Sequence, residues 1–358
     1  MLTFIRRTAA VAALFLSFGV AASAETRLQG AGSTFVNPIM QRWVAEYQKL
    51  QPNVKIDYQS IGSGGGVKGF LDSTLDFACS DAPLNKKELA TAGGAEGVVE
   101  FPIVSGGVVP AYNLPGVSKE LRFSGPVIAD IYQGKITRWN DPKLAQLNPG
   151  VNLPATVITP VWRTDGSGTT YIFSSYLTTQ SEEFKGSIGA GKQVKWPVGQ
   201  GGKGNEGVTA VVQQTAGSLG YIEQAYADQN KVTYGSVMNK AGKFVRSSPA
   251  AVSKAGEDAA QHLQGTVLAT DLWNQPGDEA YPISGFVYVF VYKDMKNIKS
   301  QEKAQALVTF LHWAATDGQK LAMELDYAPL SPAVQEKAQA AMAVLTFGGA
   351  AVKPVASR

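Results

Sequence analysis

The sequence predicts an α/β fold that is divided into two domains. Within the first 85 residues a strand runs three times into a turn rich in Gly, Ser and Thr, and two of these turns open a helix. This alternation is typical of a sheet covered by helices. The chain has 358 residues, more than one hydrophobic core usually serves, so we expect two domains.

Residues 1–24 have the features of a cleaved secretory signal peptide. Arg6 and Arg7 precede an apolar stretch over residues 9–20, and Ala22–Ala24 reads as a small-x-small cleavage signal. The apolar stretch is shorter than the roughly 20 residues that a membrane-spanning helix needs. We therefore expect export by the general secretory route, cleavage after Ala24, and no insertion of the mature protein into the membrane.

The composition argues against several classes of protein. The formal net charge is +3, and removal of the two signal-peptide arginines leaves +1 with both signs interspersed, so we expect no nucleic-acid partner. Cys79 is the only cysteine, which fits the periplasm better than a disulfide-stapled extracellular scaffold. His262 and His312 are far apart and are predicted to be ordinary helix residues, so we expect neither a metal site nor a cofactor.

The first third of the chain supplies the three strand–turn units. An amphipathic helix is predicted over Asn37–Leu50, where apolar residues recur at helical spacing. A second helix is expected to begin near Val67. The preceding strands are predicted at Arg27–Gln29, Val54–Ser60 and Asp76–Cys79, and the turns after them contain Thr34, Ser63 and Asp81. Because ligands in such sheets lie beyond the carboxyl ends of the strands, we expect these three side chains to meet at one edge.

The rest of the chain continues the same pattern. Further strands are predicted at Phe101–Asn113, Val157–Arg163, Gly220–Ile222 and Tyr281–Tyr292. Further helices are predicted at Pro126–Tyr132, from the turn after Arg163 to about Leu177, and at Val208–Thr215, Gln301–Ala315 and Pro332–Leu345. Residues 245–277 are expected to be helical with loops, and the small, polar tail from Gly348 is expected to be disordered.

The stretch Val161–Thr170, V-W-R-T-D-G-S-G-T-T, carries the parts of an oxyanion site. Arg163 offers a guanidinium fork that Asp165 can hold in place, and the turn after it offers hydroxyls and backbone N–H groups at a helix start. An ordinary polar turn with a surface ion pair explains this stretch equally well on its own. The hydroxyls at the other three turns favour the anion site.

Asp81 narrows the class of ligand. A carboxylate among anion-binding groups is repulsive unless the ligand has a proton to donate, which phosphate has near neutral pH and sulfate lacks. Such an acceptor can discriminate by factors of about 10⁴–10⁵ against an analogue without the O–H group. Helix or turn capping by an ordinary Asp is the alternative interpretation of this residue.

Three other chemistries fit the sequence poorly. Gly199–Gly207 resembles a phosphate-binding P-loop, but Gly204 follows Lys203 where a Ser or Thr is required, so we expect a flexible glycine loop ahead of a helix. Ser167 lies in Gly-Ser-Gly rather than in G-x-S-x-G, and it lacks a histidine base. Two aspartates are too few for a metal-dependent phosphatase.

Many motifs in one order resemble the periplasmic phosphate-binding proteins (PstS-type) of ABC transporters, over almost all of the predicted mature chain. The first three are G-A-G-S-T-F at Gly30–Phe35, I-G-S-G-G-G-V-K at Ile61–Lys68 and D-F-A-C-S-D-A-P-L at Asp76–Leu84. The others are I-Y-Q-G-K-I-T-R-W at Ile131–Trp139, R-T-D-G-S-G-T at Arg163–Thr169, W-P-V-G-Q-G-G-K-G-N at Trp196–Asn205 and L-D-Y-A-P-L at Leu325–Leu330. The sequence departs from the family's pattern in and directly after the first motif, at Ser33, Val36 and Asn37. Cys79 also stands beside the pair Ser80-Asp81.

The resemblance implies a type II periplasmic binding protein fold, with two α/β domains, a hinge and a ligand cleft between the domains. The chain would cross between the domains near Ser105 and return near Pro282. Residues 25–104 and 283–358 would then form one discontinuous domain, and residues 105–282 the other. It also implies high-affinity phosphate binding in the periplasm by a monomer, and delivery to an inner-membrane ABC permease with its ATPase, without catalysis.

The resemblance further implies which residues bind phosphate. Thr34 and Phe35 would supply backbone N–H groups, with the Thr34 hydroxyl added, Ser63 would donate, and Asp81 would accept the phosphate proton. Arg163 would be the charged donor, held by Asp165. Ser167, Gly168 and Thr169 would form the turn of the second domain. A secreted phosphatase and a receptor for another tetrahedral oxyanion are the two alternatives. Turnover of a phosphate ester would favour the first, and a site without the Asp81 acceptor the second.

Overall fold

The computed structural model describes residues 25–355, so the predicted signal peptide lies outside the described residues. Eight strands of this part of the chain form one mixed sheet in the order β2-β1-β3-β11-β4-β8-β6-β7. They are β1 (Thr26–Gly32), β2 (Val54–Ser60), β3 (Phe77–Ser80), β4 (Val98–Asn113), β6 (Thr159–Arg163), β7 (Gln200–Gly202), β8 (Ser218–Glu223) and β11 (Ser284–Tyr292). The predicted α/β class is therefore confirmed.

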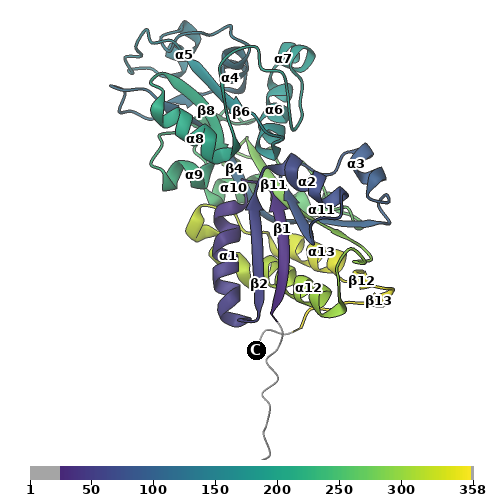
Figure 1. The fold of residues 1–358 in the computed structure, drawn as a ribbon. Coiled ribbons are helices and arrows are strands. Elements are labelled where there is room, and N and C mark those ends of the chain that lie inside the picture. Colours follow the sequence, from purple (N-terminus) through teal and green to yellow (C-terminus); the bar gives the residue numbers. More distant parts are fainter. Residues whose placement is uncertain (1–24, 356–358) are drawn as a thin grey trace, which may run out of the picture.

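The sheet has two halves that β4 joins (Figure 1). In the first half, β1 pairs in parallel with β2 and β3, and β11 pairs antiparallel with β4 as far as Gly107. In the second half, β8 pairs antiparallel with β4 from Val108 onward, and β6 pairs in parallel with β8 and β7. One 16-residue strand thus changes its partners midway and runs through both halves.

Helices cover each half separately. The first half carries α1 (Asn37–Leu50), α2 (Ser63–Leu71), α3 (Lys86–Thr91), α12 (Gln301–Ala315) and α13 (Pro332–Met342). The second half carries α4 (Gly125–Tyr132), α5 (Pro142–Leu147), α6 (Gly168–Gln180), α7 (Glu182–Ser187), α8 (Gly204–Gln214) and α9 (Gln224–Gln229). The bounds of α1, β2 and α12 are those predicted, because their apolar spacing is regular from end to end.

The remaining elements are short. A three-stranded sheet is formed by β10 (Phe244–Val245), β9 (Ser236–Met238) and β5 (Arg122–Phe123), and a hairpin by β12 (Thr346–Phe347) and β13 (Ala350–Ala351). The other helices are α10 (Pro249–Ala255), α11 (Ala259–His262) and the 3₁₀ turns Asp317–Leu321 and Met323–Leu325. Both histidines lie on helices, as expected.

Buried aromatic side chains fill each half and support the loops at the strand ends. Phe70 stacks on Tyr292 at 4.4 Å between ring centroids in the first half, and Phe173 stacks on Tyr221 at 4.2 Å in the second. Burial of the Phe70 and Phe173 rings contributes roughly 1.5–3 kcal/mol each. The Tyr221 hydroxyl also accepts a hydrogen bond from the Arg163 backbone N–H at 3.2 Å. The core of the second half therefore fixes the end of β6.

Two local predictions in the first half are wrong, and a third, at Gly199–Gly207, is described with the site. Helix α2 begins at Ser63 rather than near Val67, although glycines disfavour helices. The glycines are needed for close packing, because a Cβ on Gly66 would lie 2.5 Å from the Gly32 Cα. The tail from Gly348 is not disordered throughout, since β13 pairs with β12 and Val352 is buried and donates its N–H to the Leu345 carbonyl at 3.0 Å.

Residues 266–270 pack against the first half, although the predicted boundaries place them in the second domain. The Leu268 N–H donates to the Glu100 carbonyl of β4 at 2.8 Å, and the Tyr288 hydroxyl of β11 donates to the Thr270 carbonyl at 2.8 Å. The predicted return of the chain near Pro282 thus comes after this segment. The domain boundaries remain a prediction.

Candidate functional site

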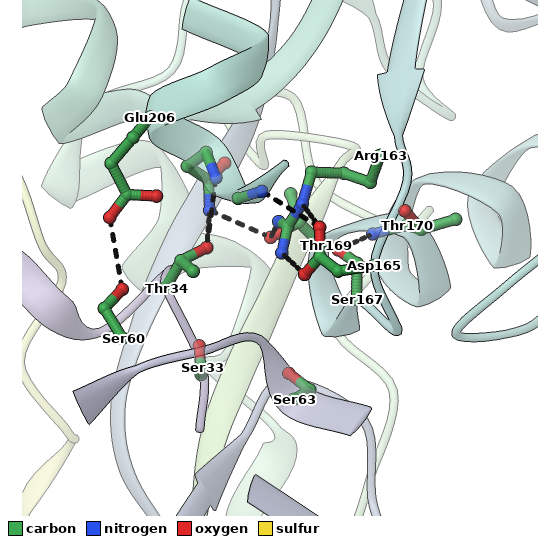
Figure 2. Close-up of polar contacts among 12 residues, drawn as sticks. Ser33, Thr34, Ser60, Ser63, Arg163, Asp165, Ser167, Thr169, Thr170 and Glu206 are labelled. Atoms are coloured by element: carbon green, nitrogen blue, oxygen red, sulfur yellow. Dashed lines mark hydrogen bonds and ion pairs between the residues drawn. The ribbon is translucent and has the colours of Figure 1, made fainter. Parts of the chain in front are cut away.

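Loops and helix starts from both halves converge where the strands end (Figure 2). In the first half, Ser33 and Thr34 follow β1, Asp81 follows β3, and Ser63 begins α2. The second half brings Arg163 at the end of β6, with the first turns of α6 and α8 beside it. The predicted edge of the sheet thus collects the side chains expected there, and the helix N-termini add partial positive charge.

Arg163 is held by a two-point ion pair. Its Nε donates to the Asp165 Oδ1 at 2.8 Å and its Nη2 to the Asp165 Oδ2 at 2.5 Å, with the Arg163 side chain 1% exposed. The Gly204 N–H also donates to the Asp165 Oδ1 at 2.9 Å. Burial opposes ionisation of Asp165, but the hydrogen bond and charge of Arg163 outweigh it and lower the pKa of this carboxyl. The pair fixes one edge of the guanidinium and leaves Nη1 on the other side, 3.4 Å from the Thr169 hydroxyl.

Asp81 is buried between the two halves. Its Oδ1 accepts from the Ser33 hydroxyl and its Oδ2 from the Thr169 hydroxyl at 3.2 Å. Burial raises the pKa of Asp81 to about 6, although the hydrogen bond from Ser33 and the charge of Arg163 oppose this shift. Its side chain caps neither of the nearest helices: Asn85 caps α3, and α2 has no side-chain cap.

Backbone N–H groups add further donors. In the described residues, no hydrogen bond to a protein acceptor is found for the N–H groups of Thr34, Phe35, Ser63, Gly168 or Thr169. The last three belong to the first turns of α2 and α6, where helix geometry leaves N–H groups without a partner. Such N–H groups are suited to an anion.

Two of the predicted site residues have additional structural roles. The Ser167 hydroxyl caps α6 by accepting from the Thr170 N–H at 3.0 Å. The Phe35 ring is fully buried, and the Phe35 carbonyl accepts from the Tyr327 hydroxyl at 2.5 Å. Phe35 thus offers only its backbone N–H to the site.

The two halves contact each other directly at the site. The Gly64 N–H donates to the Gly166 carbonyl at 2.8 Å. The Ser60 hydroxyl donates to the Glu206 Oε1 at 3.1 Å, as Figure 2 shows. A Cβ on Gly168 would lie 2.6 Å from the Cβ, N and Oδ2 of Asp81. The Gly-Ser-Gly turn therefore requires glycine for this close approach.

The sequence prediction missed Asn205, at the start of α8, and Ser33, in the turn after β1. Asn205 is fully buried, and its Nδ2 donates to the hydroxyls of Thr34 at 2.7 Å and Thr169 at 3.3 Å. Gly199–Gly207 was expected to be a flexible loop, but it contains β7 and the first turn of α8, which delivers Asn205. The sequence pattern that could have indicated Asn205 is an Asn that follows a Gly-rich turn at the start of a helix. Ser33, next to Thr34, was likewise not predicted as a site residue.

Two other kinds of feature are not found in residues 25–355. This part of the chain has no group of three or more His, Cys, Asp or Glu side chains arranged to bind a metal ion. Nor does it contain a helix with the length and apolar character that crossing a membrane requires.

Comparison with known proteins identifies the family of this chain. A family model described as a PBP superfamily domain matches residues 19–317. The phosphate-binding protein PstS of Pasteurella multocida is 42% identical over 336 residues, which cover 94% of this chain and 95% of that protein. This chain belongs to the PstS family of phosphate-binding proteins. PstS of Haemophilus influenzae is also 42% identical, over 85% of this chain and 88% of that protein.

Two solved structures share the fold. A phosphate-binding protein from Stenotrophomonas maltophilia has a TM-score of 0.68 at 20% identity, covering 92% of this chain and 100% of that chain. A second structure is a putative phosphate ABC transporter substrate-binding protein from Clostridium perfringens, solved with bound phosphate. It has a TM-score of 0.61 at 20% identity and covers 85% of this chain and 100% of that chain. The predicted family and the periplasmic binding protein fold are both confirmed.

Proposed function

We propose that this protein is a non-catalytic receptor that binds inorganic phosphate between its two halves. The observation that carries the proposal is the buried Asp81 carboxyl beside the Arg163 fork and the free N–H groups of Thr34 and Phe35. The guanidinium and the N–H groups suit a tetrahedral oxyanion, and the carboxylate suits one that carries a proton. The PstS names of the relatives support the same ligand.

Nine residues are proposed to contact or orient the anion. Thr34, Phe35, Ser63 and Asp81 would act from the first half, and Arg163, Ser167, Gly168 and Thr169 from the second, with Asp165 holding Arg163. Because both halves contribute groups, ligand binding would favour the closed arrangement over an open one. The hinge would lie where β4 changes partners, near Ser105, and at the return of the chain near Pro282.

The family supports a proposal about the biological setting. We propose that the protein is exported by its signal peptide and acts in the periplasm as a monomer. It would deliver phosphate to inner-membrane ABC permease subunits and their ATPase. The similarity to the Clostridium perfringens protein, which is described as a phosphate ABC transporter substrate-binding protein, supports this setting.

Calorimetry on refolded, phosphate-free protein tests the proposal. We expect tight binding of phosphate and much weaker binding of sulfate, measured at two pH values. Equal affinity for the two anions would remove the role given to Asp81 and favour a general oxyanion receptor. A chromogenic phosphate ester should not be turned over.

A further inference from the structure

Asn205 joins the two halves at the site and is absent from the proposed set of phosphate contacts. It is the second residue of α8 and is fully buried. Its Nδ2 donates to the Thr34 Oγ1 of the first half at 2.7 Å and to the Thr169 Oγ1 of the second half at 3.3 Å. One side-chain amide thus contacts two of the hydroxyls proposed to face the anion.

The orientation of this amide is set by the second half alone. The Asn205 Oδ1 accepts a hydrogen bond from the Glu223 backbone N–H at 3.0 Å. A backbone N–H can only donate, so the side-chain oxygen must face β8 and the Nδ2 group must face the hydroxyls. The donor that meets Thr34 is therefore positioned by β8.

The contacts with Asn205 also determine what the Thr34 hydroxyl can do. The Thr34 Oγ1 accepts from the Asn205 Nδ2 and, in addition, from the Asn205 backbone N–H at 3.2 Å. A hydroxyl has two lone pairs and one proton. With both lone pairs engaged, the Thr34 hydroxyl can only donate. A hydroxyl restricted in this way favours an oxyanion and disfavours a ligand group that itself needs an acceptor.

We propose that Asn205 is a positioning residue that makes the Thr34 hydroxyl an obligate donor to the bound anion. The contact joins the two halves, so this restriction exists only in the closed arrangement. Asn205 therefore couples closure to the donor character of the site. The inference rests on the proposed function, because it takes phosphate as the anion.

A double-mutant cycle with phosphate tests the coupling. Asn205→Ala should weaken phosphate binding roughly 10- to 100-fold, through the loss of hydrogen bonds between buried groups. Most of the change should lie in the dissociation rate, since the lost contact closes the site. In a Thr34→Val background the same substitution should cost clearly less than in the wild-type background, because the Thr34 hydroxyl that it orients is gone and the Thr169 hydroxyl is the proposed site group that still loses its contact with Asn205. Equal losses in the two backgrounds would overturn the proposal.

A second variant separates positioning from folding. Asn205→Asp keeps the size and still presents an oxygen to the Glu223 N–H, but it places an acceptor against the Thr34 hydroxyl and turns that proton away from the anion. Phosphate binding should be weaker than in Asn205→Ala, and binding equal to wild type would overturn the proposal.

Asn239→Ala provides the matched control. Asn239 is a buried amide whose Nδ2 binds the carbonyls of Gly277, Asp278 and Ala280. Its removal should lower the unfolding temperature and leave phosphate affinity unchanged. Failure of the wild-type protein to bind phosphate would disprove the proposed function and this inference together. If the wild-type protein binds phosphate but the effects of the Asn205 and Thr34 substitutions on affinity simply add, the inference alone would be disproved.

Discussion

The Asp81 carboxylate and the Thr169 hydroxyl are 88 positions apart in the sequence, yet the Asp81 Oδ2 accepts from the Thr169 Oγ1 at 3.2 Å. Asp81 follows β3 of the first half, and Thr169 lies in the first turn of α6 in the second. The contact therefore forms only when the two halves are together. The contact connects two proposed ligand-binding groups. One is the carboxylate that would accept the ligand's proton, and the other is the helix N-terminus that would bind the ligand's oxygens.

Replacement of Asp81 by Asn should relax the choice between phosphate and sulfate. The substitution removes both the repulsion of a fully ionised anion and the carboxylate that accepts the phosphate proton. We expect the ratio of phosphate to sulfate affinity to fall at least tenfold, by roughly the energy of one charge-assisted hydrogen bond. Calorimetry with both anions measures this ratio. The control is Asp72→Asn on the exposed end of α2, and an unchanged ratio in the Asp81 variant would assign the discrimination to another group.

Gly168→Ala should prevent closure without unfolding the protein. The new Cβ would lie 2.6 Å from Asp81, a contact between the two halves that opening relieves. We expect roughly 10- to 100-fold weaker phosphate binding, in line with the cost of overpacking a buried contact. Small-angle scattering with saturating phosphate should show a more open average shape. Gly186→Ala is the matched control, because a Cβ on Gly186 meets nothing within 4 Å. Wild-type affinity in the Gly168 variant would show that the approach of the two halves is looser in solution.

Lys192→Met should speed the release of phosphate. The Lys192 Nζ lies 2.6 Å from the Glu88 Oε1 of α3, and each side chain is less than one-fifth exposed. The Lys192 carbonyl also accepts from the Ser167 N–H at 2.8 Å, so the pair ties the first half to the segment that holds the Gly-Ser-Gly turn. We expect phosphate affinity to fall roughly two- to tenfold, mainly in the dissociation rate, which stopped-flow measurement would resolve. Lys185→Met, which removes an exposed pair within α7, should have no effect. An equal change in both variants would point to net charge instead.

Glu100→Gln should alter the pH dependence of stability. Glu100 is fully buried on β4, and its Oε1 has no hydrogen-bond partner among the described residues. Burial raises the pKa of Glu100 from 4.5 to about 8, although the Leu84 N–H and the charge of Lys192 oppose the shift. The folded state thus retains this proton more strongly than the unfolded state does. Its stabilising contribution is complete below pH 4.5 and declines as the pH rises toward 8.

The side chain of the Gln variant stays neutral at every pH, so its contribution to stability does not fall as the pH rises. The unfolding temperature of the variant, relative to wild type, should therefore rise by a few degrees between pH 5 and pH 8 in thermal scans. Glu96→Gln serves as the control, because the Glu96 side chain is 91% exposed and its removal should not change the slope. Parallel curves for wild type and the Glu100 variant would show that this carboxyl is ionised in the folded protein.

Local sequence patterns determined much of the fold and the composition of the candidate site. The apolar spacing of residues 37–50 and 301–315 gave the bounds of two helices, because a helix that packs on a sheet must present one continuous apolar face. Side chains at the ends of neighbouring strands meet at one edge, so Thr34, Ser63 and Asp81 could be grouped before their distances were known.

Only the tertiary structure decided how those groups contact one another. Asn205 was not predicted as a site residue because the glycine-rich sequence around it is typical of a flexible loop. In the structure, the preceding strand β7 pairs with β6, and this pairing orders the segment. Helix α2 was expected to begin near Val67, but it includes the glycines before it, and Gly66 allows close packing between backbones. In the stretch Val161–Thr170, the sequence alone supplied an Arg, an Asp and a helix start. The hydroxyl of Thr169 faces Asp81, and the amide of Asn205 reaches Thr34, because closure of the two halves brings together groups that no local pattern relates.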